Sequence, residues 1–216
     1  AGIAPQDTAS KMDLVIDNAT KRMGGQIDEM SPMNYLCDLT DENWDRMIKV
    51  HLYGAFYGCR AALTHMQPQR SGRIINISSI AGRWVSPGSG WYGASKFALE
   101  ALSDALRLEL KSFGLQVVVV EPGVIATDFP NVAGPSIERS LSCSTYSTMM
   151  RAVRKSWDSV YRGASQPLEV ALTIERALSD PNPHARYLCG HQSTSVIASR
   201  ILPTRLWDSL VRLQMT

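Results

Sequence analysis

The sequence predicts a single α/β domain built on a mostly parallel sheet. Short apolar runs of strand length alternate along the chain with stretches of helical periodicity. A chain of 216 residues can bury a substantial core, and its 44% hydrophobic and 19% charged residues exclude a mainly disordered protein. The 22 basic residues against 20 acidic ones give no electrostatic reason to expect a nucleic-acid partner.

The strand signals are short apolar runs bounded by polar residues or turn residues. The run over residues 115–121 contains four consecutive valines, as expected of a parallel strand buried on both faces. The runs expected to form strands cover residues 13–19, 73–79, 115–121 and 186–189.

The helix signals are apolar stripes with capping residues at their ends. Thr40 is a favourable N-cap, Gly114 a natural C-cap, and Pro167 suits the first position of a helix. The expected helices cover residues 42–66 (ending near Pro68), 91–113 and 167–178. Residues 1–12 and 128–166 look irregular, and the tail over residues 194–215 is moderately amphipathic with a break at Pro203.

Ser79, Tyr92 and Lys96 form the strongest candidate for a chemical site. Tyr92 and Lys96 are four apart on a predicted helix, so their side chains share a face. A nearby ammonium group favours the phenolate and should lower the pKa of Tyr92, which would suit it to general acid/base work. Ser79 ends a predicted parallel strand, where α/β sheets bind ligands. On the Tyr–Lys spacing alone, a solvated surface pair is the more usual interpretation, because the same spacing occurs on many helices.

Three motifs together resemble the short-chain dehydrogenase/reductase family. They are Asn76–Gly82 (NISSIAG), Tyr92–Lys96 (YGASK) and Glu121–Thr127 (EPGVIAT), and they occur in the family's order. The separation of 13 residues between Ser79 and Tyr92 is also the family's usual one. The resemblance covers residues 13–129, with a weaker similarity from Pro167 to the end of the chain.

The resemblance implies a Rossmann-like doubly wound parallel sheet and an NAD- or NADP-dependent oxidoreductase that interconverts an alcohol and a ketone or aldehyde. In the family's pattern, Tyr92 is the proton donor or acceptor, Lys96 tunes Tyr92 and holds the nicotinamide ribose, and Ser79 orients the substrate oxygen. The cofactor itself carries the hydride chemistry. The nicotinamide would be lined by Pro122, Gly123, Val124 and Thr127.

The sequence departs from the family at its N-terminal half. No strand and glycine-rich turn precede Asp13 to receive a pyrophosphate. The one literal GxGxxG, formed by Gly88, Gly90 and Gly93, lies in the wrong part of the fold. We therefore expect a sheet that is incomplete at this half, with the strand over residues 13–19 as an unpaired edge and a chain that is poorly stable alone. The choice between NAD and NADP stays open.

Two further positions differ from the family's pattern. Asp17-Asn18-Ala19-Thr20 stands where the family has Asn-Asn-Ala-Gly, and the resemblance keeps Asn18 and Ala19 as cofactor-binding residues. His51 stands where the family has a helix asparagine that supports a proton relay. A histidine can donate and accept hydrogen bonds, so His51 could serve the relay or simply pack in the helix.

The remaining expectations concern substrate and partners. Residues 186–203 resemble relatives that act on retinoid-, steroid- or lipid-like molecules, which favours a lipophilic substrate. Residues 128–166 would form a substrate lid, whose aromatic residues and methionines equally suit a small helical core. The resemblance implies a homo-oligomer that pairs through helices 42–66 and 91–113. The four scattered cysteines favour a reducing, cytoplasmic compartment and no metal site, and the apolar stretches are too short for a membrane span. The amphipathic tail is expected to make at most weak peripheral membrane contact.

Two other functions compete with the oxidoreductase. The first is a catalytically inert or truncated homologue that acts as an assembly or regulatory partner. The second is a sugar-nucleotide epimerase or dehydratase, which also uses a YxxxK pair. Pro122-Gly123 with Thr127, and the short C-terminal region, argue against the epimerase.

Overall fold

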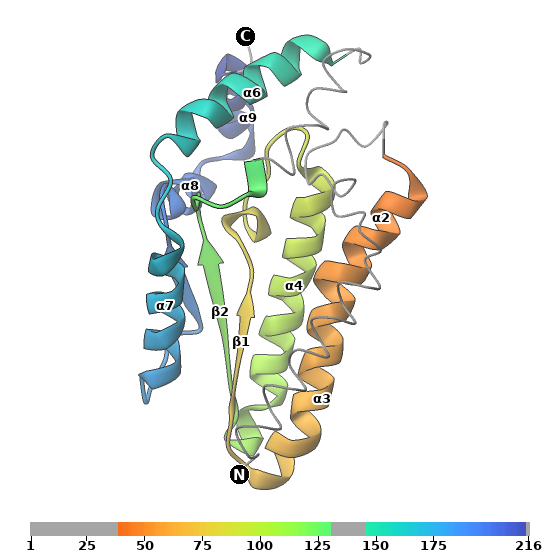
Figure 1. Cartoon of the computed structure of the whole chain (residues 1–216), viewed down its shortest axis with the longest axis vertical. Helices are drawn as coiled ribbons and strands as arrows, with labels where there is room; N and C mark the ends of the chain where they lie inside the picture. Colours follow the sequence, from red (N-terminus) through yellow and green to blue (C-terminus); the bar gives the residue numbers. More distant parts are fainter. Residues whose placement is uncertain (1–38, 131–145, 215–216) are drawn as a thin grey trace.

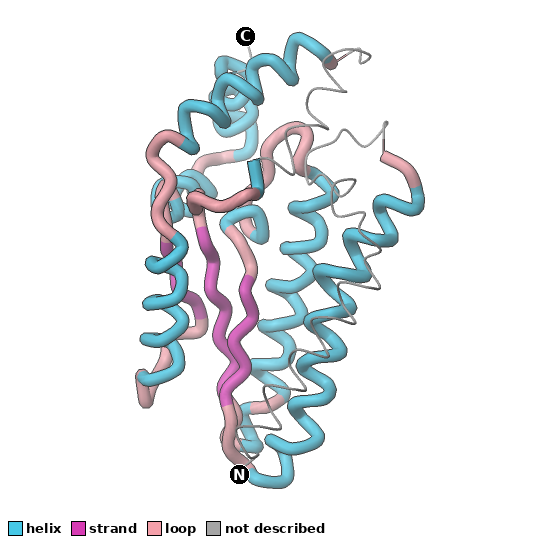
Figure 2. Tube along the Cα trace, viewed as in Figure 1, coloured by secondary structure: helices cyan, strands magenta, loops and turns pink. Residues whose placement is uncertain are grey.

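The computed structural model describes residues 39–130 and 146–214 and confirms the α/β fold (Figures 1 and 2). Its sheet has three parallel strands in the order β1 (Arg73–Ile77), β2 (Gln116–Pro122) and β3 (Arg186–Cys189). These are three of the four predicted strands, with bounds shifted by two residues at most. The predicted strand over residues 13–19 and the candidate residues Asn18 and Ala19 lie outside the described residues.

Helices cover both faces of this sheet (Figure 1). Adjacent residues of β2 point to opposite faces: Val117 packs with Leu110 beside α4 (Gly90–Glu109), while Val118 packs with Ala177 of α7 (Pro167–Ser179). This double burial explains why the strand is almost uniformly apolar. A short 3₁₀ turn, η5 (Lys111–Phe113), follows α4, and Gly114 ends it at φ +74°, as the capping signal predicts.

The helix predicted over residues 42–66 is a composite in the structure. α2 (Asp41–Ile48) passes into a π-helical turn, η3 (Lys49–Tyr53), and then into α3 (Gly54–Gln69). The helix ends near Pro68 as expected, although it runs three residues past the predicted bound at Met66: Pro68 lies in the last turn of α3, and the helix closes on Arg70 in the left-handed conformation. Pro68 has no N–H to donate to the carbonyl four residues before it, so the last turn of the helix lacks one backbone hydrogen bond.

The end of the molecule at the carboxyl ends of the strands is more helical than the sequence predicts (Figure 1). α6 (Ser147–Tyr161) lies in the segment expected to be irregular. It was missed because Tyr146 at its N-cap makes no side-chain capping bond, so no start signal marks it. The tail forms α8 (Ser193–Ala198), η6 (Ser199–Ile201) and α9 (Thr204–Gln214), with the predicted break at Pro203. In the described residues, none of the helices has the length and apolar character needed to span a membrane.

Candidate active site

Ser79 and Tyr92 are brought together by the segment that links β1 to α4. Ser79 follows the end of β1 and caps a short 3₁₀ turn, η4 (Ile80–Gly82), where its hydroxyl accepts a hydrogen bond of 3.1 Å from the amide of Ala81. Tyr92 stands in the first turn of α4, and its side chain hydrogen-bonds with that of Ser79. The sequence prediction that these two residues share a site is consistent with this contact.

Lys96 joins the same group from the next turn of α4. Its ammonium donates to the carbonyl oxygen of Ile77, the last residue of β1, at 3.2 Å, and lies 5.9 Å from the centre of the Tyr92 ring. Burial lowers the pKa of Lys96 to about 8, while the negative charge of Glu100 opposes the shift. Among the described residues, this acceptor takes one of the three ammonium hydrogens, and the other two can donate to a ligand.

The pKa of Tyr92 differs from the expectation. Burial raises it above its usual value, and the hydrogen bond with Ser79 only partly opposes that rise. The sequence argument, that the Lys96 ammonium would lower this pKa, is wrong for the chain on its own, because desolvation penalises the phenolate more than the surrounding charges favour it. Tyr92 is therefore a neutral phenol near pH 7, with a proton to donate.

His51 stands in the π-helical turn and reaches the same site. Its Nδ1 lies 3.1 Å from the hydroxyl oxygen of Ser95, and its ring meets the Tyr92 ring edge-on at 5.5 Å. Ser95 donates its only hydroxyl hydrogen to the carbonyl of Tyr92, at 2.7 Å, so His51 must be the donor and carries its proton on Nδ1. Burial and then the charge of Lys96 lower the pKa of His51 to about 4, which makes the ring neutral at pH 7.

The loop after β2 carries the residues assigned to the nicotinamide. The amide of Gly123 donates to the carbonyl of Cys189 at 2.7 Å, and that of Val124 donates to the carbonyl of His191 at 2.9 Å. A Cβ at Gly123 would lie 2.3 Å from the His191 oxygen, so only glycine fits there. Thr127, farther along the loop, is exposed and accepts a hydrogen bond from the amide of Phe129.

A chain of aromatic rings leads away from Tyr92 toward α6. Tyr92 contacts Phe129, Phe129 contacts Trp157, and Trp157 contacts Tyr161, with ring centres 5.5–5.9 Å apart. The sequence singled out Trp157 and Tyr161 as lid or core residues but missed Phe129. Its position two residues after Thr127, just beyond the EPGVIAT motif, was the available signal. The rings give the site an apolar wall.

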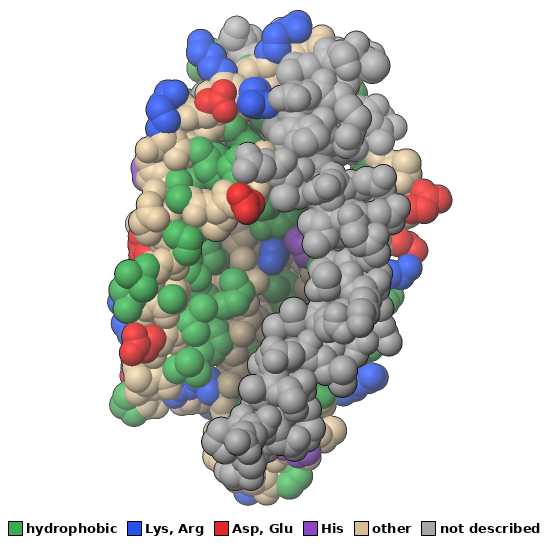
Figure 3. Space-filling model, in the orientation of Figure 1, with side chains coloured by type: hydrophobic (Ala, Val, Ile, Leu, Met, Phe, Trp, Pro, Cys, Tyr) green, Lys and Arg blue, Asp and Glu red, His purple; other side chains and the backbone are tan. Residues whose placement is uncertain are grey.

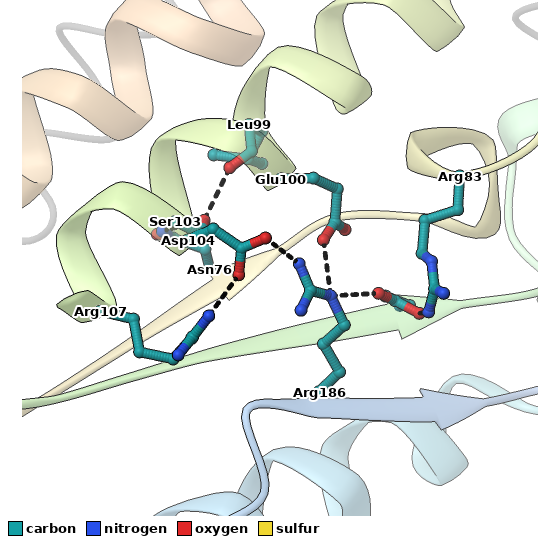
Figure 4. Close-up of polar contacts among 9 residues, drawn as sticks. Asn76, Arg83, Leu99, Glu100, Ser103, Asp104, Arg107 and Arg186 are labelled. Atoms are coloured by element: carbon teal, nitrogen blue, oxygen red, sulfur yellow. Dashed lines mark hydrogen bonds and ion pairs between the residues drawn. The ribbon is translucent and has the colours of Figure 1, made fainter.

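A partly buried ionic network surrounds Arg186 (Figure 4). The Nε of Arg186 lies 3.1 Å from both the Glu100 and the Glu121 carboxylates, and its terminal nitrogen lies 2.7 Å from Asp104. Arg83, which follows η4, approaches Glu121 at 3.5 Å. Burial, and then the charge of Glu100, raise the pKa of Glu121. The network ties β2, β3, α4 and the segment after Ser79 together, and the sequence analysis missed it.

The chain is similar to proteins of known family. A family model described as short chain dehydrogenase matches residues 4–136. A probable short-chain type dehydrogenase/reductase of Helicobacter pylori is 42% identical over 142 residues, which are 65% of this chain and 52% of the relative. A 3-ketodihydrosphingosine reductase of Bacteroides thetaiotaomicron is 31% identical, covering 83% of this chain and 63% of its own length. Mouse retinol dehydrogenase 5 is 30% identical, with coverages of 80% and 58%.

The fold is similar to solved structures as well. A short-chain dehydrogenase from Streptomyces avermitilis superposes with a TM-score of 0.63 at 22% identity, covering 84% of this chain and 66% of that one. A serine dehydrogenase complexed with NADP⁺ superposes with a TM-score of 0.57 at 25% identity, covering 73% of this chain and 59% of that one. The chain thus spans between about half and two thirds of the length of these proteins.

Proposed function

Because the chain belongs to the short-chain dehydrogenase family, we propose that it is an NAD- or NADP-dependent oxidoreductase that interconverts an alcohol and a ketone or aldehyde. The observation that carries this proposal is the neutral phenol of Tyr92, hydrogen-bonded to Ser79 and beside the ammonium of Lys96. These three groups can bind one substrate oxygen, protonate it and stabilise the charge that remains.

In the reducing direction, the Tyr92 phenol gives its proton to the carbonyl oxygen of the substrate, and the Ser79 hydroxyl orients that oxygen. The nicotinamide cofactor supplies the hydride. The Lys96 ammonium stabilises the phenolate that the proton transfer leaves on Tyr92. In the oxidising direction, the Tyr92 phenolate takes the proton of the alcohol, and a bound NAD or NADP would accept the hydride.

The residues of the site suit such a cofactor. The two remaining ammonium hydrogens of Lys96 can donate to ribose hydroxyls, and the loop of Pro122, Gly123, Val124 and Thr127 ends a parallel strand, where α/β sheets bind nucleotides. A related fold is known with NADP⁺ bound. Titration of NADH and NADPH into the chain, followed by nicotinamide fluorescence, tests the binding step directly. Saturable micromolar binding supports the proposal, and no binding to a folded sample counts against it for this chain.

We expect the rate of reduction to fall as the pH rises through about 8. The pKa of Lys96 is about 8, so its ammonium is charged below this pH and neutral above it. Loss of that charge removes the stabilisation of the Tyr92 phenolate. A pH profile of kcat/KM with saturating cofactor measures the effect. A profile that stays level up to pH 10 would contradict this role of Lys96.

His51→Asn is the matched control for that profile. We propose that His51 is a positioning residue, which acts through its hydrogen bond to Ser95 rather than by gaining a proton. With a pKa of about 4, it is neutral through the whole working range. In the His51→Asn variant, kcat/KM should therefore still fall as the pH rises through about 8, whatever the absolute rate of the variant. If the pH at which kcat/KM falls shifts in His51→Asn, the titrating group is His51 and not Lys96.

We propose a lipophilic substrate on the basis of the aromatic wall. The rings of Phe129, Trp157 and Tyr161 extend from Tyr92 and offer an apolar lining to a long or ring-shaped substrate. Relatives named for 3-ketodihydrosphingosine and retinol are in keeping with this chemistry. Comparing kcat/KM across alcohols of increasing chain length tests it, because each added methylene in an apolar pocket should raise kcat/KM.

We also propose that two copies pair through α3 and α4. Exposed aromatic rings lie along these helices: Phe56 and Tyr57 on α3, Tyr53 at the end of η3 just before it, and Phe97 on α4 are exposed by 39–50%. A second copy of the chain would bury these rings, because exposed apolar patches of this kind favour protein–protein contact. The mass of the protein in solution, measured by light scattering, tests the pairing.

A further inference from the structure

α6 has an inner face that belongs to the site. Met150 and Val153 are fully buried, and Trp157 and Tyr161 continue the aromatic chain that starts at Tyr92. These positions recur at helical spacing, so they define one face of the helix. The opposite face of α6 therefore points away from the aromatic wall, toward the outside of the molecule.

That outer surface is strongly basic. Arg151, Lys155 and Arg162 are exposed and align along one stripe, and no carboxylate of the described chain lies within ion-pair distance of them. Arg154 pairs with Asp158 at 3.4 Å. Residues 147–162 carry four basic side chains against one acidic one, a net charge of +3, whereas the whole chain carries +2. Figure 3 shows Lys and Arg side chains gathered at the end of the molecule where Figure 1 places α6.

A hollow lies against the same stripe. Its volume is about 390 Å³, and the described side chains that line it are Arg151, Arg154, Lys155, Asp158 and Arg162. Four of these five side chains are cations that can donate hydrogen bonds to phosphate oxygens. The hollow therefore fits an anionic headgroup better than a neutral polar group.

α9 adds apolar surface at the same end of the molecule (Figure 1). Trp207 packs edge-on against Trp84 at 5.9 Å, which fixes one side of the helix to the body of the protein. Leu206 and Leu210, one turn apart on another side, remain 48% and 40% exposed, and Ile201 just before the helix is 87% exposed. The side of α9 that carries Trp207 thus packs on the body of the protein, while Leu206 and Leu210 on another side stay partly exposed.

We propose that the end of the molecule formed by α6 and α9 docks on an anionic lipid surface. A helix that presents leucines beside arginines binds at the boundary between headgroups and acyl chains, and each nearby cation strengthens its attraction to anionic lipids. The positive charge concentrated on α6 favours an anionic lipid surface over a neutral apolar partner. Docking there would place the aromatic wall of the site next to the membrane from which a lipophilic substrate could enter.

The experiment measures co-sedimentation of the full chain with lipid vesicles, without cofactor or substrate, so its outcome is independent of the proposed oxidoreductase activity. We expect binding to phosphatidylcholine vesicles that contain about 30% phosphatidylglycerol, and weak binding to phosphatidylcholine alone, because the anionic lipid supplies the surface charge. Raising the salt should weaken the binding, since it screens this attraction. Equal binding to both vesicle types would overturn the proposal.

Three variants locate the surface. Arg151→Glu/Lys155→Glu/Arg162→Glu should weaken vesicle binding by about 100-fold or more, because each lost cation costs roughly a factor of five. The matched control, Lys49→Glu/Arg70→Glu/Lys111→Glu, changes the net charge equally on exposed residues of other elements and should bind as the parent does. Leu206→Ser/Leu210→Ser should weaken binding while keeping its salt dependence. Equal loss in the control variant would overturn the assignment to α6, as would stronger retention of the chain by a DNA oligonucleotide than by vesicles.

Discussion

Replacing Tyr92 by phenylalanine is expected to lower kcat by about 10²- to 10⁴-fold, the usual contribution of a general acid. The phenol is the neutral proton donor at the site, and the change removes only its oxygen. The ring remains in place between His51 and Phe129, so cofactor and substrate binding should change little. Steady-state rates with the best alcohol or ketone measure the effect as a loss in kcat with a nearly unchanged KM.

The interpretation depends on an intact fold. Circular dichroism and the melting temperature of Tyr92→Phe should match those of the parent, because no packing atom other than the hydroxyl oxygen is lost. Trp157→Phe provides a contrast, since it alters the apolar wall without touching the proton donor and should mainly raise KM. A Tyr92→Phe protein that turns over at the parent rate would disprove the proposed oxidoreductase mechanism.

Replacing Arg186 by methionine is expected to lower the free energy of unfolding by about 3 kcal/mol, the low end for breaking a buried ion pair. The Arg186 side chain is 28% exposed, so part of its contribution is screened by solvent. Its partners are more deeply buried: the Glu121 side chain is fully buried and the Glu100 side chain is 8% exposed. The variant leaves two neighbouring carboxylates without their shared cation. Denaturant unfolding of both proteins measures the difference.

Arg107→Met is the matched control. In the part of the chain that the structure describes, Arg107 pairs with the 41% exposed Asp104 and with no other carboxylate, so the substitution should cost less than about 1 kcal/mol. Lowering the pH provides a second check. The pKa of Glu121 is raised by burial and by Glu100, so this carboxyl takes up a proton at a higher pH than an exposed one. Protonation removes the unpaired charge, and the deficit of Arg186→Met should shrink as the pH falls. A deficit that is absent at pH 7, or that grows in acid, would contradict the structural role of the network.

The local signals that the sequence carries determined most of the regular structure. The four valines of residues 117–120 predict a strand buried on both faces, and the structure places them between α4 and α7. Pro167 and Gly114 fix a helix start and a helix end at the predicted places. Each signal depends on the preference of one residue or one short run, so it needs no knowledge of distant parts of the chain. The same holds for the order of Ser79, Tyr92 and Lys96, which the motifs alone identify.

Tertiary structure decided what those residues can do. The sequence argument for a lowered Tyr92 pKa considered the neighbouring charge alone, and burial reverses the direction. The π-helical turn that brings His51 to Ser95 and Tyr92 arises between two ordinary helical stretches and has no local signal. Burial, tautomer and ion pairing depend on groups that are far apart in the chain, as when Arg186 meets Glu100 and Glu121. A pattern read along the sequence contains the residue types but not these distances, and the distances set the protonation states on which the chemistry depends.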